Sequence, residues 1–224
     1  MHRITEVDAL RGIAIILMII YHFFFDLAYF GIHDINIFDT AMVLLQRTVG
    51  TLFLFLVGFS LVLSEKRNRE GYIHHAKRAA RLGMVAALIT IVTWIYPHEG
   101  FIKFGIIHMI ALSTLIAPFF LRFGPANLIL ALIIITVGWG IHYTDSPYLF
   151  WLGWIRPDYF ALDHYSLFPW FGIILIGIYA AQNIRIPKIG YNLDLLALLG
   201  RNSLLIYMVH QPLLVALMLM LVIK

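Results

Sequence analysis

Seven long apolar stretches constrain what this chain can fold into more than any other feature. They lie at residues 13–32, 41–63, 79–96, 104–121, 127–143, 167–181 and 203–223. A helix needs about 20 apolar residues to cross the hydrocarbon core of a bilayer, and a spanning backbone must satisfy its own hydrogen bonds there. We therefore predict an all-α fold, a polytopic integral membrane helical bundle with about seven spans, in one domain over residues 1–224.

The composition agrees with a membrane protein and excludes several other classes. Of the 224 residues, 62% are hydrophobic and 12% are charged, and soluble proteins have about twice that charged fraction. The chain has no cysteine, which excludes disulfides, thiolate nucleophiles and iron–sulfur clusters. The net charge of +4 does not predict nucleic-acid binding, because the basic residues gather at the ends of the apolar stretches.

The positions of Lys and Arg predict how the bundle is oriented. With a cytoplasmic N-terminus, the inner connections are residues 64–78, 122–126 and 182–202, and their basic residues are Lys66, Arg67, Arg69, Lys77, Arg78, Arg122, Arg185, Lys188 and Arg201. Cytoplasmic loops are enriched in Lys and Arg. We therefore expect a multi-pass protein of the cell (plasma) membrane, with its N-terminus inside and Asp145 and Asp163 outside.

One connection is rich in aromatic residues. Residues 146–162 contain Tyr148, Trp151, Trp154 and Tyr159 among prolines and charged side chains. Aromatic rings of this kind gather where a protein meets the bilayer surface. The pattern predicts an interfacial loop or a short re-entrant segment, and an eighth short helix is the alternative.

Charged and imidazole groups at or inside the predicted spans are candidates for function, because each costs about a few kcal/mol in a membrane. Arg11 and His22 are eleven positions apart, on one helix face and about 16 Å apart along the axis. Asp26, one turn beyond His22, is expected to accept a hydrogen bond from one ring nitrogen and leave the other as a general base. Asp8 is expected to hold Arg11. In the alternative, His22 only bridges to a neighbouring helix and Asp26 lies at headgroup level.

Two other spans carry such groups. Arg47 enters the second stretch to about the depth of His22, where a guanidinium can stabilise an oxyanion. A salt bridge to Asp26 is its alternative role. His210 lies in the middle of the last stretch, just before Pro212, which frees a backbone carbonyl one turn back. A structural hydrogen bond is the alternative role of His210.

The remaining patterns indicate little chemistry. His108, near the outer end of the fourth stretch, fits an interfacial role as well as a catalytic one. No HExxH motif and no paired-carboxylate spacing occurs, so we predict no metal site. The absence of a Walker loop, a GxGxxG motif and a GxSxG elbow removes the usual nucleotide-binding and serine-hydrolase functions.

Four segments, taken together, resemble a known family. Residues 8–14 (DALRGIA), followed by His22 after ten residues that separate it from Arg11, resemble the Arg-x10-His signature of the transmembrane acyltransferase superfamily. Three further segments resemble the bacterial and archaeal heparan-alpha-glucosaminide N-acetyltransferase-like branch, in the family's order: residues 104–111 (FGIIHMIA), 169–177 (PWFGIILIG) and 199–212 (LGRNSLLIYMVHQP). The similarity covers nearly the whole chain.

The resemblance implies a single transmembrane acyltransferase-like domain. Such an enzyme moves an acetyl (acyl) group from cytoplasmic acyl-CoA to a hydroxyl or amine of a sugar, lipid or small acceptor. His22 matches the family's catalytic histidine, as base or acyl carrier, and Arg11 its essential arginine. We expect the catalytic site to be completed by Asp26, Arg47 and His210. The expected contacts to the co-substrate acetyl-CoA are Arg11, His108, Arg201, Asn202 and Ser203.

Two other functions remain open. A small proton-coupled transporter or flippase would use the same buried polar groups, and a noncatalytic membrane partner would use none of them chemically. The chain has fewer predicted spans than larger relatives, which speaks against a large glycan acceptor. The expected partners are the lipid bilayer, acyl-CoA and the unknown acceptor, and the sequence leaves a homodimer open.

Overall fold

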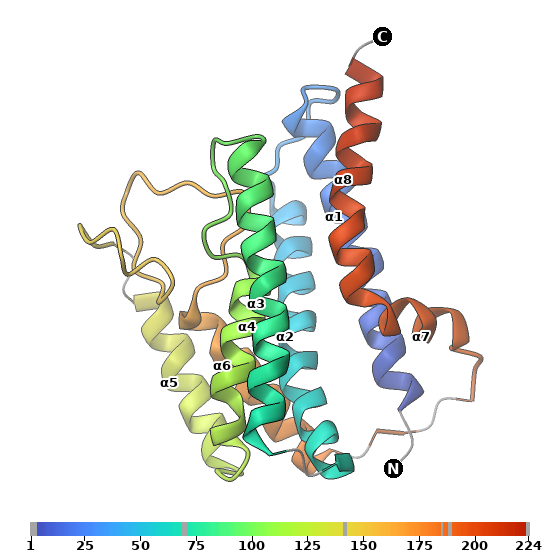
Figure 1. Cartoon of the computed structure of the whole chain (residues 1–224), viewed down its shortest axis with the longest axis vertical. Helices are drawn as coiled ribbons and strands as arrows, with labels where there is room; N and C mark the ends of the chain where they lie inside the picture. Colours follow the sequence, from blue (N-terminus) through green and yellow to red (C-terminus); the bar gives the residue numbers. More distant parts are fainter. Residues whose placement is uncertain (1–3, 69–70, 141–142, 185, 188–189, 223–224) are drawn as a thin grey trace. The chain divides into compact units, whose positions relative to one another are not determined.

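The computed structural model describes residues 4–68, 71–140, 143–184, 186–187 and 190–222. Within these residues the regular structure is helical, and the only β-pairing is two isolated bridges. The chain divides into two compact units, which are described separately. The terminal unit comprises His2–Phe53 and Ile186–Lys224, and the central unit comprises Leu54–Arg185 (Figure 1).

The terminal unit joins the first and the last helix of the chain. It is formed by α1 (Thr5–Tyr29), residues 40–53 of α2 (Thr40–Asn68), α7 (Asp194–Arg201) and α8 (Ser203–Val222). Ile15, Met18 and Val49 form a buried apolar cluster that joins α1 to α2. Helices α1 and α8 run in the same direction, because hydrogen bonds link Asp8 to Arg201 near their first residues and Asp26 to Gln211 further along.

Two glycines let α1 and α7 approach each other closely. A Cβ atom on Gly12 would collide with the backbone carbonyl of Leu196, and one on Gly200 would collide with that of Asp8. Small residues permit this backbone contact between membrane helices. Helix α7 is therefore held against the first half of α1.

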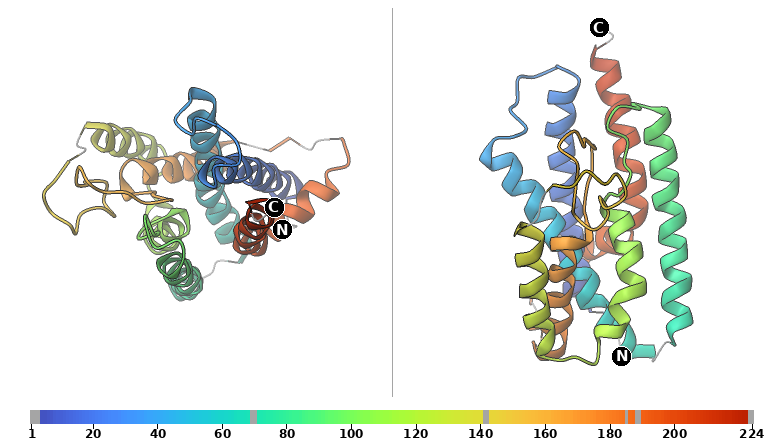
Figure 2. Two further views of the ribbon diagram at one scale, coloured as in Figure 1. Left: turned by 90° about the horizontal axis from the view of Figure 1, so that it is seen from above. Right: turned by 90° about the vertical axis from the view of Figure 1, so that its left-hand side faces the viewer.

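The central unit contains the rest of α2 together with α3 (Tyr72–Ile95), α4 (Ile106–Ile116), the 3₁₀-helix η1 (Ala117–Phe120), α5 (Ala126–Gly140) and α6 (Leu167–Asn183). Helix α3 lies beside α4, and α5 lies beside α6 (Figure 2). Gly58 of α2 and Gly177 of α6 bring these two helices together, because a Cβ on either would meet the partner's backbone.

The aromatic loop, residues 143–166, is held to the central unit by Asp163. The carboxylate of Asp163 accepts the backbone N–H of Ile106 at 2.9 Å, at the first turn of α4. Gly105 is needed beside it, because a Cβ there would collide with the Asp163 carboxylate. No helix lies within this loop, which excludes the alternative of an eighth short helix over residues 146–162.

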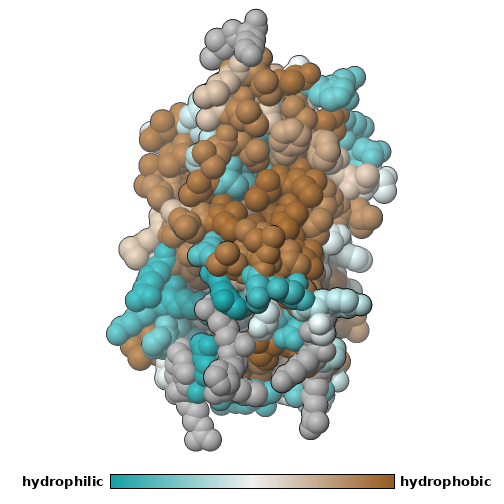
Figure 3. All heavy atoms as spheres, turned by 90° about the vertical axis from the view of Figure 1, so that its right-hand side faces the viewer, coloured by the Kyte–Doolittle hydropathy of each residue, from teal (hydrophilic) through white to brown (hydrophobic). Residues whose placement is uncertain are grey.

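Four helices in the described part of the chain are long and apolar enough to cross a membrane: α1, α2, α3 and α8. Helices α4 with η1, α5 and α6 are apolar but shorter. On the face drawn in Figure 3, apolar side chains cover a broad area and hydrophilic ones gather toward one end. Large exposed residues of α8, among them Leu205, Leu213 and Met220, need a lipid environment. The chain is a membrane protein, and the count of seven spans stays a prediction.

Each predicted apolar stretch contains a helix among the residues that the structure describes, but several limits differ. Helix α1 begins at Thr5, well before residue 13, because its polar first half contacts α7. The fourth helix changes to 3₁₀ geometry at Ala117, where Pro118 supplies no backbone N–H. Helix α7 was not predicted, because its eight residues are too few to give an apolar stretch of spanning length.

Candidate functional site

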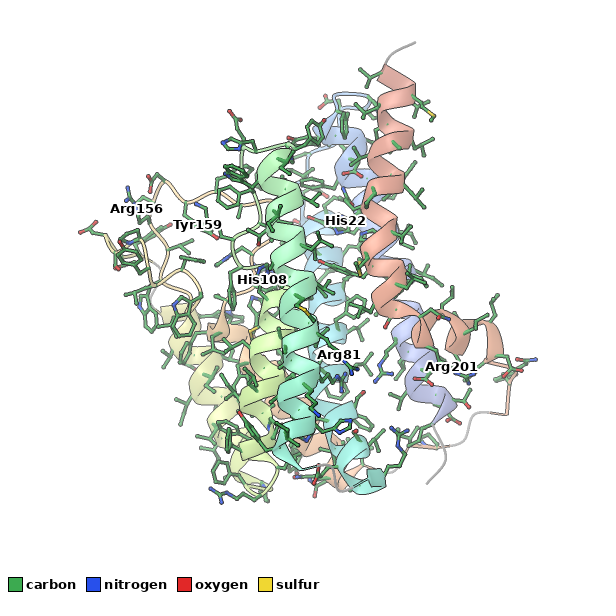
Figure 4. The ribbon with its side chains drawn as sticks, in the orientation of Figure 1. His22, Arg81, His108, Arg156, Tyr159 and Arg201 are labelled. Atoms are coloured by element: carbon green, nitrogen blue, oxygen red, sulfur yellow. The ribbon has the colours of Figure 1, made fainter. Side chains whose placement is uncertain are left out.

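The terminal unit places two histidines against each other. His22 of α1, labelled in Figure 4, and His210 of α8 have ring centroids 5.0 Å apart, with the ring planes inclined at 61°. The Nδ1 atom of His22 and the Nε2 atom of His210 are both buried, and neither has a hydrogen-bond partner among the described residues. An unpaired buried polar atom costs about 1–3 kcal/mol, so a pair of them at one place marks a candidate ligand site.

The orientation of the His210 ring is fixed by a backbone carbonyl. Its Nδ1 atom lies 2.6 Å from the carbonyl oxygen of Tyr207. A carbonyl only accepts hydrogen bonds, so Nδ1 carries the hydrogen and donates it. The unpartnered Nε2 atom is then the one with the lone pair.

Asp26 has a different partner from the one predicted. Its two carboxylate oxygens lie 2.9 and 3.1 Å from the Nε2 atom of Gln211, which donates to them. No hydrogen bond joins His22 to Asp26, so the predicted His22–Asp26 pair is wrong. That prediction used the spacing of residues within α1 alone, whereas the hydrogen-bond partner of Asp26 belongs to α8. The Oε1 atom of Gln211 is buried and also lacks a partner in the described chain.

A second polar cluster lies toward the first residues of α1. Arg11 donates to Asp8 at 2.9 Å, as predicted, and Arg201 donates to the other oxygen of the same carboxylate at 3.4 Å. The side chain of Arg201 remains 42% exposed. Asn202 donates to the carbonyl of Leu198 at 2.9 Å, and Ser203 begins α8. Thus the structure brings together three of the predicted CoA contacts, Arg11, Arg201 and Asn202, with Ser203 next in the chain.

Two predicted site residues lie outside these clusters. Arg47 is exposed on α2 and makes no hydrogen bond or ion pair with any described residue, so its predicted approach to His22 or Asp26 is not formed. His108 belongs to α4 of the central unit. The backbone N–H of Gly105 donates to its Nδ1 at 3.2 Å, and its Nε2 lies 3.0 Å from the hydroxyl of Thr90. Both ring nitrogens of His108 are therefore occupied.

Sequence reasoning missed Arg81 and Gln211. Arg81 extends from α3 away from α4 (Figure 4), is exposed, and has no hydrogen bond or ion pair with a described residue. The signal for it was present, because Arg81 is a charge inside the predicted third stretch. Gln211, the residue after His210, was not predicted, because a neutral amide gives no charge signal.

These features define a class. Long apolar helices that need lipid, which carry a pair of histidines in ring contact and a buried carboxylate, make this chain a helical membrane protein with an internal polar site. The chain belongs to the family described as "Heparan-alpha-glucosaminide N-acetyltransferase, catalytic", whose model matches residues 3–212. It is accordingly an acetyltransferase-type membrane enzyme. No curated protein and no solved structure shows a significant match.

Proposed function

We propose that the protein transfers an acetyl group from cytoplasmic acetyl-CoA to a hydroxyl or amine of a sugar, lipid or small molecule. His22 is the principal reacting residue, as general base or transient acyl carrier. The observation that carries this proposal is the buried Nδ1 atom of His22, which lacks a partner in the described chain and faces a second such imidazole. A base kept free of hydrogen bonds is available for a proton or an acyl group.

The polar groups near His22 favour an acetyl acceptor that donates hydrogen bonds. The Nε2 atom of His210 and the Oε1 atom of Gln211 both accept hydrogen bonds and are both unfilled. The Asp26 residue, whose carboxylate is also an acceptor, is 2% exposed, and among the described residues its side-chain donor is Gln211. Hydroxyl and amine groups supply O–H and N–H donors that complement such a site.

The donor is proposed from the cluster of Arg11 and Arg201. Guanidinium groups bind phosphates through paired N–H donors. Arg11 lies eleven residues before His22 on α1, which is about 16 Å along a helix. An extended pantetheine arm separates the phosphates of CoA from its thioester in a similar way.

The proposed orientation in the membrane follows from the distribution of Lys and Arg along the chain. A cytoplasmic N-terminus in the plasma membrane would place Arg11 and Arg201 on the side where acyl-CoA is made. The family match extends across both units, which supports their action as one transmembrane acyltransferase-like domain.

Label transfer in proteoliposomes tests this function. Purified protein is reconstituted with a total extract of membrane lipids and glycans, supplied with radiolabelled acetyl-CoA, and the label is followed into each fraction. The enzyme should acetylate at least one fraction. Movement of solutes across the membrane with no label transfer would instead indicate a transporter or flippase. Neither result, despite intact folded protein, would indicate a noncatalytic partner.

A further inference from the structure

The two histidines of the site differ in how their rings are held. His210 donates from Nδ1 to the carbonyl of Tyr207 at 2.6 Å, which fixes both its tautomer and its orientation. Among the described residues, His22 makes ring contacts and no hydrogen bond; the centroid of its ring lies 5.4 Å from that of Tyr21 and 5.0 Å from that of His210. A general base works best when a hydrogen bond on one nitrogen holds the other lone pair in place. That description fits His210 better than His22.

The surroundings leave the Nε2 lone pair of His210 free. This atom is buried and has no partner in the described part of the chain. Gln211 follows His210 in the chain, and its side-chain amide donates to the Asp26 carboxylate. The Tyr207 ring, 5.5 Å from the His210 ring, supplies the carbonyl that holds Nδ1. Nothing described on α1 or α8 donates to Nε2.

We propose that His210 is a second catalytic residue of the acetyl transfer, the base that takes the acceptor's proton. This inference rests on the proposed function and leaves the donor side to His22. The acceptor's O–H or N–H bond breaks, its proton moves to Nε2 of His210, and its electron pair forms the bond to the acetyl carbonyl carbon.

The electrons and the proton of this step balance. The bond that the acetyl group leaves gives its electron pair to the CoA thiolate in direct transfer, or to the His22 nitrogen when the acetyl group is carried there. The proton held by His210 then neutralises the CoA thiolate. The net reaction consumes acetyl-CoA and acceptor and releases CoA thiol and acetylated acceptor, with no other reactant.

A matched substitution separates this role from a structural one. The side-chain NH2 of asparagine occupies about the place of Nδ1 in histidine, so His210→Asn keeps a donor for Tyr207 and removes the base. His33→Gln, at an exposed histidine of the same unit, is the control. Transfer of labelled acetate to the native acceptors of the membrane is measured for the three proteins across a range of pH, and CoA binding is measured by calorimetry in nanodiscs.

We expect His210→Asn to bind CoA like the wild type and to lose about 100-fold or more in transfer rate, the usual contribution of a general base. Its remaining rate should keep rising with pH, since without the base only acceptor that is already deprotonated reacts, whereas the wild-type rate levels off. Hydroxylamine, which attacks thioesters without a base, should be acetylated by the variant at nearly the wild-type rate.

The outcomes separate the two proposals. If wild type and His33→Gln transfer acetyl and His210→Asn does so equally fast with the same pH profile, His210 holds Tyr207 and nothing more, and this inference is overturned. If the wild type neither binds CoA nor transfers label, the proposed function itself fails.

Discussion

The buried carboxylate of Asp26 is hydrogen-bonded by one neutral side chain, Gln211, which the residue pattern of α1 could not predict. A buried carboxylate needs donors, and Gln211 supplies them from α8. The oxygen of the same amide is buried and has no hydrogen-bond partner among the described residues. Gln211 follows His210 directly in the chain, which is why we keep Asp26 in the proposed site although no hydrogen bond joins it to His22.

Arg201 gives a prediction at the same scale. Arg201→Ala should weaken CoA binding about tenfold or more, because a charge-assisted hydrogen bond contributes about 1.5–3 kcal/mol. The measurement is calorimetry with CoA in nanodiscs of zwitterionic lipid. Leu205→Ala, which removes an exposed apolar side chain from the same unit, is the control and should leave the affinity unchanged. An unaltered affinity in Arg201→Ala would assign this side chain to lipid headgroups instead.

At the scale of elements, the close contact of α1 with α7 depends on two glycines, Gly12 and Gly200, which have no side chain. Gly12→Ala and Gly200→Ala each place a methyl group against a backbone carbonyl, and overpacking of this kind costs about 1–3 kcal/mol. Both variants should unfold at lower temperature in detergent. Gly83→Ala in α3, where a Cβ meets nothing within 4 Å, should be neutral or stabilising. Equal unfolding temperatures for all three variants would contradict the close approach of α1 and α7.

The cap on α4 makes a second prediction at this scale. Burial raises the pKa of the Asp163 carboxyl from 3.8 to about 6, against the opposing effect of the Ile106 N–H. Because the folded-state pKa is the higher one, the folded state binds this proton more tightly, and the stabilisation present at low pH is lost as pH rises through about 6. Burial also lowers the pKa of His164 from 6.5 to about 4, so His164 removes stability as pH falls from 6.5.

The two effects oppose each other, so the prediction concerns a difference. Between pH 7 and pH 4 the wild type should gain stability relative to Asp163→Asn, by at most about 3 kcal/mol for a shift of this size. Unfolding temperatures in detergent measure it. Asp158→Asn is the control, because Asp158 is exposed and paired with Arg156. Parallel curves for the wild type and Asp163→Asn would show that this carboxyl does not change its protonation in that range.

The elements also show what a sequence can predict here. Every apolar stretch is helical, because hydropathy alone forces helix formation in lipid. Helix α7 was missed, because its position depends on Gly12 and Gly200 rather than on its own hydropathy. The pairing of Arg11 with Asp8 is local and was predicted, whereas the partner of Asp26 comes from far along the chain. His22 and His210 were each predicted as site residues, but their mutual contact depends on how α1 packs on α8.

At the scale of the whole molecule, the orientation in the membrane stays a prediction of the Lys and Arg distribution. The absence of cysteine from the chain allows single cysteines to report it. In intact cells an impermeant thiol reagent should label Asp145→Cys in the aromatic loop and not Tyr191→Cys, an exposed position between α6 and α7. Permeabilised cells, in which both should react, are the control. The opposite labelling would reverse the topology and place the arginine cluster outside.

The central claim is that His22 performs acetyl transfer, and one measurement tests it most directly. Initial rates of label transfer from radiolabelled acetyl-CoA are compared for wild type and His22→Ala in the same proteoliposomes, with CoA affinity measured on the same preparations. The account predicts that His22→Ala keeps its fold and its CoA affinity and loses transfer, since only the reacting group is removed. Transfer at the wild-type rate by a folded, CoA-binding His22→Ala protein would contradict it.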